Sequence, residues 1–98
     1  MAYTKEELFQ CICECMFESL PSNWKSASMK VEITGNEIQS NFYFTNSNSS
    51  KNSFKPINFI APMNAAKELK EIMSAEGQDW GTMTITISPE GQYEVSIE

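Results

Sequence analysis

Four segments of the chain alternate apolar with polar residues, and this period of two constrains the fold more than any other feature. The segments span residues 29–34, 38–44, 82–87 and 93–97. Successive side chains of a strand point to opposite faces of its sheet, so each segment predicts a strand with one apolar face. Such strands build an antiparallel sheet that needs a cover on one side and can meet solvent on the other.

Turn residues join these segments in two pairs. Gly35 and Asn36 separate the first two segments, and both residue types accept a positive φ, so we expect a tight hairpin turn with a positive φ at both. Residues 88–91, Ser-Pro-Glu-Gly, separate the last two segments and predict a type I turn with proline at its second position. The sequence therefore predicts two antiparallel hairpins.

Two further segments have the spacing of amphipathic helices. Residues 4–20 open with the capping-box sequence Thr-Lys-Glu-Glu, carry apolar residues three and four positions apart, and end before Pro21. Residues 62–76 repeat this spacing, and Gly77 is placed to adopt the left-handed conformation that follows a helix. Each helix has an apolar face that must pack on the sheet or on a partner.

The stretch between the first hairpin and the second helix changes from polar to apolar. Residues 45–53 contain only Asn, Ser, Thr and Lys and predict a mobile loop. The apolar residues of 54–60 predict a third strand, in which Pro56 requires either a position at the edge of the sheet or a place among the first residues of the strand. The expected fold class is α+β, an antiparallel sheet of about five strands with two helices in the order α-β-β-β-α-β-β. Residues 1–98 are expected to form a single domain.

The charges of the chain are unbalanced. Its 13 Asp and Glu residues outnumber seven Lys residues, Arg and His are missing, and the formal net charge is -6. Phosphate binding relies on clustered basic residues and base recognition on bidentate Arg, so we expect no direct binding to DNA or RNA. Surplus negative charge favours a basic protein partner, although it also serves solubility alone. No apolar run of about 18 residues is present, so we expect no membrane span.

Few residues of the chain could carry catalysis. The absence of His removes the commonest general base and excludes Ser-His and Cys-His nucleophile pairs. Glu32 with Glu37, and Glu90 with Glu94, are expected at outward positions, whereas acid–base work needs burial or a close like charge. A carboxylate-dependent hydrolase would need two such groups in one pocket, and the pattern offers no such pair. We expect no enzyme activity and no cofactor.

Three cysteines lie close together at Cys11, Cys13 and Cys15. On a helix, Cys11 and Cys15 share a face while Cys13 points away, so the three thiols cannot converge on one metal ion. An odd number of cysteines in one short run is a poor disulfide framework, which indicates reduced thiols in a cytoplasmic protein. We interpret them as small apolar side chains, with a redox-sensing thiol as the alternative.

Five short motifs together resemble a known family. They are Leu-Pro-Ser-Asn-Trp at 20–24, Val-Glu at 31–32, Asn-Phe-Tyr-Phe at 41–44, Asp-Trp-Gly-Thr-Met-Thr at 79–84 and Gly-Gln-Tyr at 91–93. Over nearly its whole length the chain resembles the YezG-type immunity (antitoxin) family. Members of that family neutralise polymorphic toxins, often nucleases, in bacterial competition systems that include contact-dependent growth inhibition. The resemblance implies an immunity protein that binds a cognate toxin 1:1 and is a monomer when free.

Aromatic and turn residues carry much of this resemblance. The residues that match the family by position are Trp24, Phe42, Tyr43, Trp80 and Gly91. Tyr43 is expected to face away from the helices, so we assign it to partner binding, with simple solvent exposure as the alternative, and we assign the other four mainly to structure. The chain departs from the family in a shorter middle region, where residues 45–53 replace a stretch rich in aspartate and aromatic residues.

An acidic surface suits such a function, because a nuclease must be basic to hold phosphate. The candidate contact residues are Glu32, Glu37, Tyr43, Asp79, Glu90 and Glu94. The alternative function is a small acidic secretion chaperone, which resembles this chain in its order of elements and acts on an effector segment as a homodimer. Such chaperones usually carry another helix after the last strand, which counts against this alternative.

Overall fold

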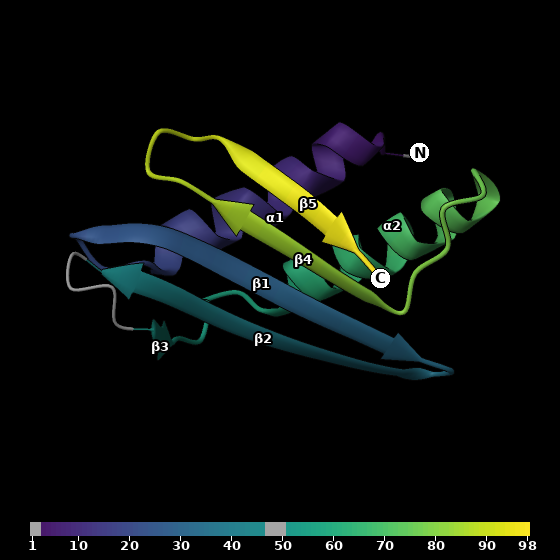
Figure 1. Ribbon diagram of the computed structural model, residues 1–98, viewed down its shortest axis with the longest axis horizontal. Coiled ribbons are helices and arrows are strands. Elements are labelled where there is room, and N and C mark those ends of the chain that lie inside the picture. The colour runs from purple at the N-terminus through teal and green to yellow at the C-terminus, as the bar shows by residue number, and fades with distance from the viewer. Residues whose placement is uncertain (1–2, 47–50) are drawn as a thin grey trace.

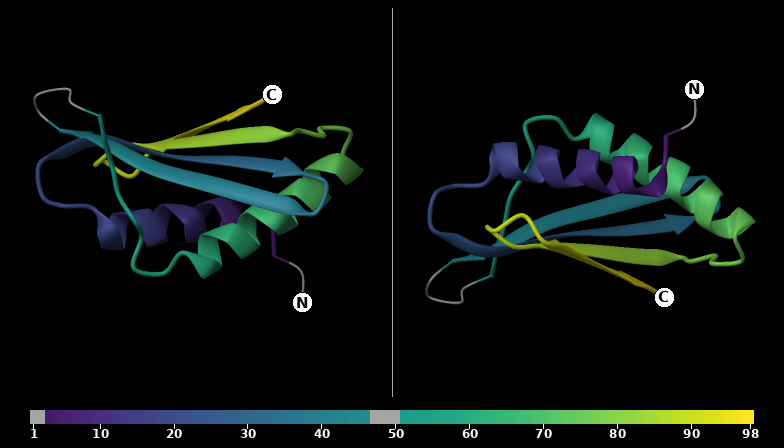
Figure 2. Two further views of the ribbon diagram at one scale, coloured as in Figure 1. Left: turned by 90° about the horizontal axis from the view of Figure 1, so that it is seen from below. Right: turned by 90° about the horizontal axis from the view of Figure 1, so that it is seen from above.

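The computed structural model describes residues 3–46 and 51–98 and has two layers. One layer is a five-stranded antiparallel sheet in the order β3-β2-β1-β4-β5, and two helices on one face of it form the other (Figure 1, Figure 2). The elements are α1 (Lys5–Ser19), β1 (Trp24–Thr34), β2 (Glu37–Asn46), β3 (Lys51–Ser53), α2 (Ile60–Ala75), β4 (Thr82–Ile87) and β5 (Tyr93–Ile97). The predicted α+β class and the predicted order of elements are confirmed.

Helix α1 begins and ends where the sequence predicts. The Thr4 hydroxyl accepts a hydrogen bond from the Glu7 amide at 3.2 Å, and the Thr4 amide donates to the Glu7 carboxylate at 3.0 Å, which completes the capping box. Leu20 has an extended backbone because a residue that precedes a proline disfavours the helical conformation, so α1 stops ahead of Pro21. The apolar side of α1, with Ile12 fully buried, faces the sheet (Figure 2).

Helix α2 starts at Ile60, two residues before the predicted start at Pro62. Proline fits the first turn of a helix because its missing amide hydrogen would have no intrahelical acceptor there. At the other end, Gly77 has a φ of 83°, and the Gln78 amide donates to the Met73 carbonyl at 2.7 Å. This is the Schellman motif, so the predicted left-handed conformation of Gly77 is confirmed.

None of the described helices has the length and apolar character needed to cross a membrane.

One apolar core lies between the helices and the sheet. Its largest fully buried side chains include Ile12, Met16, Met29, Leu69, Met83, Ile85 and Ile87. Burial alternates strictly along β4, which matches the period of two in its sequence. Burying an aliphatic side chain of this size stabilises a fold by about 1.5–3 kcal/mol, so this core holds the two layers together.

The two hairpin turns differ in backbone conformation. Gly35 has a φ of 61°, but Asn36 does not have a positive φ, so the expectation of two positive values is wrong at Asn36. One positive φ at the first central residue is the type II′ turn, which needs glycine at that position alone. In the second turn, the Gly91 amide donates to the Ser88 carbonyl at 3.0 Å, as the predicted type I turn requires.

The third strand lies at other residues than predicted. Strand β3 is Lys51–Ser53, inside the segment 45–53 that was expected to be a loop, and β2 continues through its first two residues. The strand expected over 54–60 is wrong, because residues 54–59 form neither strand nor helix. Residues 47–50 of the expected loop lie outside the described residues.

Apolar residues after β3 cover the edge of the core instead of pairing as a strand. The Phe54 amide donates to the Phe42 carbonyl at 3.0 Å, and the two rings pack with their centroids 5.7 Å apart. Pro56 has no amide hydrogen to continue the ladder, and the chain crosses there to the helical layer (Figure 2). Hydrophobicity alone could not separate this crossing from a strand.

Candidate partner-binding surface

No described element covers the face of the sheet that is turned away from the helices (Figure 2). Side chains between the buried positions of each strand point to this side. We call it the open face, and its residues are Ser26, Ser28, Lys30, Glu32, Thr34, Glu37, Gln39, Asn41, Tyr43, Thr45, Lys51, Ser53, Thr82, Thr84, Thr86, Glu94 and Ser96. None of these side chains is aliphatic, so the open face is a polar surface laid on a rigid sheet.

Strand register gathers several predicted contact residues on the open face. Tyr43, Ser28, Thr86 and Glu94 lie directly across from one another on β2, β1, β4 and β5. Neighbouring strands are about 4.8 Å apart, so about 14 Å separates Tyr43 from Glu94. The predicted contact residues on this face are Glu32, Glu37, Tyr43 and Glu94.

Glu90 and Asp79 do not lie on the open face. Glu90 occupies the turn between β4 and β5, and Asp79 the connection from α2 to β4, so opposite ends of β4 separate them (Figure 1). The Asp79 carboxylate accepts hydrogen bonds from Lys70 Nζ and Ser74 Oγ, each at 2.6 Å. These bonds, led by the one from Lys70, lower the pKa of Asp79 to about 2. Asp79 therefore stabilises the C-terminal end of α2 through its hydrogen bonds to two residues of that helix.

Replacing Asp79 by asparagine is expected to lower the thermal midpoint at neutral pH. A carboxylate whose pKa is lowered stabilises the fold above its ordinary pKa of 3.8, and that contribution is lost as the pH falls through about 2. The difference between the native and Asp79→Asn proteins should therefore shrink between about pH 4 and pH 2. Thermal unfolding followed by circular dichroism measures this, with Glu90→Gln as the control for an exposed carboxylate. A difference that stays constant over this range would contradict the assignment.

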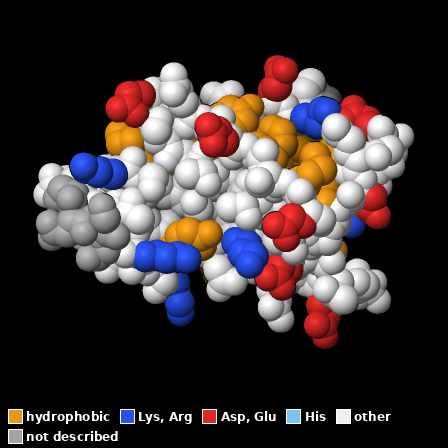
Figure 3. Space-filling model, in the orientation of Figure 1, with side chains coloured by type: hydrophobic (Ala, Val, Ile, Leu, Met, Phe, Trp, Pro, Cys, Tyr) orange, Lys and Arg blue, Asp and Glu red, His pale blue; other side chains and the backbone are white. Residues whose placement is uncertain are grey.

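Charge on the open face is divided between its two sides. Lys51 Nζ lies 4.0 Å from the centroid of the Tyr43 ring, on the side of β2 and β3. Lys30 Nζ is 3.6 Å from the Glu32 carboxylate on β1, and Glu94 stands beyond it on β5. Figure 3 views this face and shows blue lysines gathered mainly at the lower left, with red carboxylates mostly above and to the right. No local sequence pattern reveals this division, because the lysines come from separate segments.

The three cysteines are free thiols on α1. Burial raises the pKa of Cys13 to about 11, and burial followed by the effect of Cys11 raises that of Cys15 to about 11. A thiol that stays protonated at neutral pH is a poor nucleophile and a poor metal ligand. In the described parts of the chain, no three or more His, Cys, Asp and Glu side chains are grouped so that they could hold a metal ion.

Cys13 and Cys15 are expected to react slowly with iodoacetamide. With a pKa of about 11 in place of 9.0, the thiolate fraction near pH 7.5 falls about a hundredfold, and the alkylation rate falls with it. Mass spectrometry of digested samples, native against urea-unfolded, gives the rate at each residue. Equal rates in the two states would show that the thiols are not shielded.

No protein-family model and no curated protein matches this chain. The likeness to YezG-type immunity proteins therefore rests on the motifs alone. The structure places Tyr43 on the open face together with three of the predicted glutamates.

Proposed function

We propose that this protein is an immunity protein that binds a basic, nuclease-type toxin through the open face of its sheet. The observation that carries the proposal is a polar sheet face, left uncovered by the described elements, on which Glu32, Glu37, Tyr43 and Glu94 point to the same side. The helices bury their apolar sides in the core and leave this face to a partner. The proposal assigns no catalytic step to any residue.

The centre of the open face suits a protein interface. Ser28 Oγ and Thr86 Oγ1 are 3.0 Å apart, and Ser26 Oγ and Thr45 Oγ1 are 2.7 Å apart, so hydroxyls hydrogen-bond to one another across the strands. Short side chains on paired strands lose little conformational entropy when a partner binds. The Lys51 ammonium lies over one face of the Tyr43 ring. Tyrosine is one of the residue types that form interface hot spots.

Carboxylates on this face supply the electrostatic part of the proposal. A nuclease concentrates lysine and arginine around its cleft to hold phosphates. Glutamates on a partner raise the rate of encounter with such a surface and can occupy phosphate positions in it. A cytoplasmic location follows from this proposal, because the immunity protein must meet the toxin in the cell that it protects.

Survival of cells that produce the toxin tests the proposed function. The C-terminal domain of the protein encoded immediately beside this gene is expressed with and without this chain. We expect growth arrest without the chain, normal growth with it, and a 1:1 complex on size exclusion. If that domain is harmless alone, or if it kills equally well in the presence of this chain, the proposal is wrong.

The mass of the free protein separates this proposal from the chaperone alternative. An immunity protein of this kind is expected to be a monomer of 11.1 kDa, whereas a secretion chaperone would be a stable homodimer. Size exclusion with light scattering, run without any partner, measures the mass directly. A dimer that persists on dilution would favour the chaperone.

A further inference from the structure

Strand β2 has a free edge next to the short strand β3. Strand β3 pairs only with Tyr43 to Thr45, after which the Phe54 amide donates to the Phe42 carbonyl on the side away from β1. Main-chain groups of a strand alternate in direction, so those of Ser40 and Ile38 point to the same outer side as those of Phe42. Nothing in the described chain pairs with them there, so β2 can accept one more strand.

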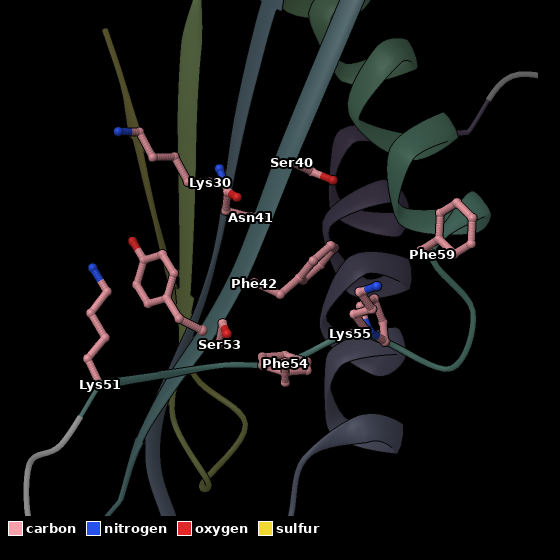
Figure 4. A pocket seen from close by; sticks show the side chains of 11 residues that line it. Lys30, Ser40, Asn41, Phe42, Lys51, Ser53, Phe54, Lys55 and Phe59 are labelled. Atoms are coloured by element: carbon pink, nitrogen blue, oxygen red, sulfur yellow. The ribbon is translucent and has the colours of Figure 1, made fainter.

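A hollow of about 1090 Å³ lies along this edge and has two kinds of wall (Figure 4). Lys30 and Lys51 stand on the side of the open face. Phe42, Phe54 and Phe59 stand on the side of the helices, where the side chain of Phe59 is 56% exposed. A strand laid against β2 would present alternate side chains to these two walls.

Positive charge distinguishes this hollow from the rest of an acidic chain. Three of the seven lysines line it, namely Lys30, Lys51 and Lys55, and none of its described lining residues is acidic. Lys55 is exposed, and only Lys30 has a carboxylate close by, that of Glu32 at 3.6 Å. An occupant of this hollow should therefore be negatively charged.

We propose that the free edge of β2 binds an extended peptide segment of another protein in which acidic and apolar residues alternate. The peptide adds as a strand beside Ile38 and Ser40, and its main chain supplies the hydrogen bonds. Its carboxylates face Lys51 and Lys30, while its apolar side chains cover the exposed phenylalanines. A nucleic acid would match the lysines but not the main-chain groups of the strand. The hollow shares Lys30, Asn41 and Tyr43 with the open face, but the proposal does not depend on a toxin, because peptide binding is measured without one.

Fluorescence anisotropy with labelled peptides tests the proposal. The probe is a peptide of about ten residues in which Glu alternates with Val, a length that covers the free edge. One control peptide has Lys in place of Glu, and another has Pro in place of Val and so cannot pair as a strand. We expect only the Glu–Val peptide to bind, and we expect exchange of the Ile38 and Ser40 amide hydrogens to slow when it does.

Two double charge reversals locate the binding site. Lys30→Glu with Lys51→Glu should weaken binding of the Glu–Val peptide at least about tenfold, because attraction becomes repulsion at the two positions that its carboxylates face. Lys25→Glu with Lys67→Glu changes the net charge equally at exposed positions outside the hollow and should change affinity less than about twofold. Circular dichroism confirms that both variants fold.

Four results would overturn the proposal. One is no binding of the Glu–Val peptide up to about 1 mM, a limit that corresponds to negligible affinity. A second is equal binding of the proline peptide, which would show attraction by charge alone. A third is tighter binding of a single-stranded DNA oligonucleotide with the same dependence on Lys30 and Lys51. The last is self-association through this edge, seen by sedimentation and lost in the lysine variant, which would make a second copy of the chain the occupant.

Discussion

Replacing Trp80 by alanine is expected to lower the free energy of unfolding by about 3–5 kcal/mol. The Trp80 side chain is only 2% exposed and belongs to the core, so its removal leaves a large cavity at one end of the sheet. Lys70 Nζ lies 5.2 Å from the centroid of the Trp80 ring and donates to the Trp80 carbonyl. Loss of the ring therefore also removes a contact that positions Lys70 for its hydrogen bond to Asp79. Urea unfolding followed by circular dichroism measures the loss.

The variant Trp80→Phe separates the effect of apolar packing from the effect of the unpaired indole N–H. The Trp80 Nε1 atom is buried without a partner among the described residues, so Trp80→Phe removes an unsatisfied donor while it keeps most of the apolar volume. We expect this variant to lose only about 1–2 kcal/mol. Ile57→Ala is the control, since the Ile57 side chain is 80% exposed and its loss should be nearly neutral. A loss below about 1 kcal/mol for Trp80→Ala would mean that Trp80 is not part of the core.

Local patterns were sufficient to predict most elements of the fold. The capping box of Thr4 and Glu7, the left-handed Gly77 and the alternation along β4 each depend on residues close together in the chain. Strand β3 could not be predicted, because it has only three residues and no alternation of apolar and polar residues. It is a strand because it pairs with Tyr43 to Thr45. That pairing is a tertiary contact, which no local pattern encodes.

Only part of the candidate surface could be predicted in the same way. The period of two correctly predicted that Glu32 and Tyr43 point away from the core. The row that joins Tyr43 to Glu94 depends on the pairing of Ser28 on β1 with Thr86 on β4, 58 residues apart in the chain, which the sequence pattern does not specify. Asp79 was placed among the contacts by its charge, whereas its hydrogen bonds to Lys70 and Ser74 depend on where α2 ends.

Reversing the charge at Glu32 and Glu37 together is expected to slow association with the cognate toxin about 10- to 100-fold at low salt. Both side chains lie on the open face, so lysine at these positions repels a basic toxin where the native protein attracts it. The effect should shrink as ionic strength rises, because salt screens exposed charges that are more than about 8–10 Å apart. Stopped-flow or surface-plasmon kinetics at two salt concentrations measures the rate, and survival of toxin-producing cells should fall in parallel.

Glu6→Lys with Glu71→Lys is the matched control for this pair of reversals. It changes the net charge by the same amount, but both glutamates are exposed on the helices. Any effect of total charge is therefore equal in the two double variants, and only the position of the charge differs. If the Glu32 and Glu37 variant binds at low salt with unchanged affinity, the toxin does not use the open face. If both variants slow association equally, net charge alone accounts for the attraction and the open face has no special part in it.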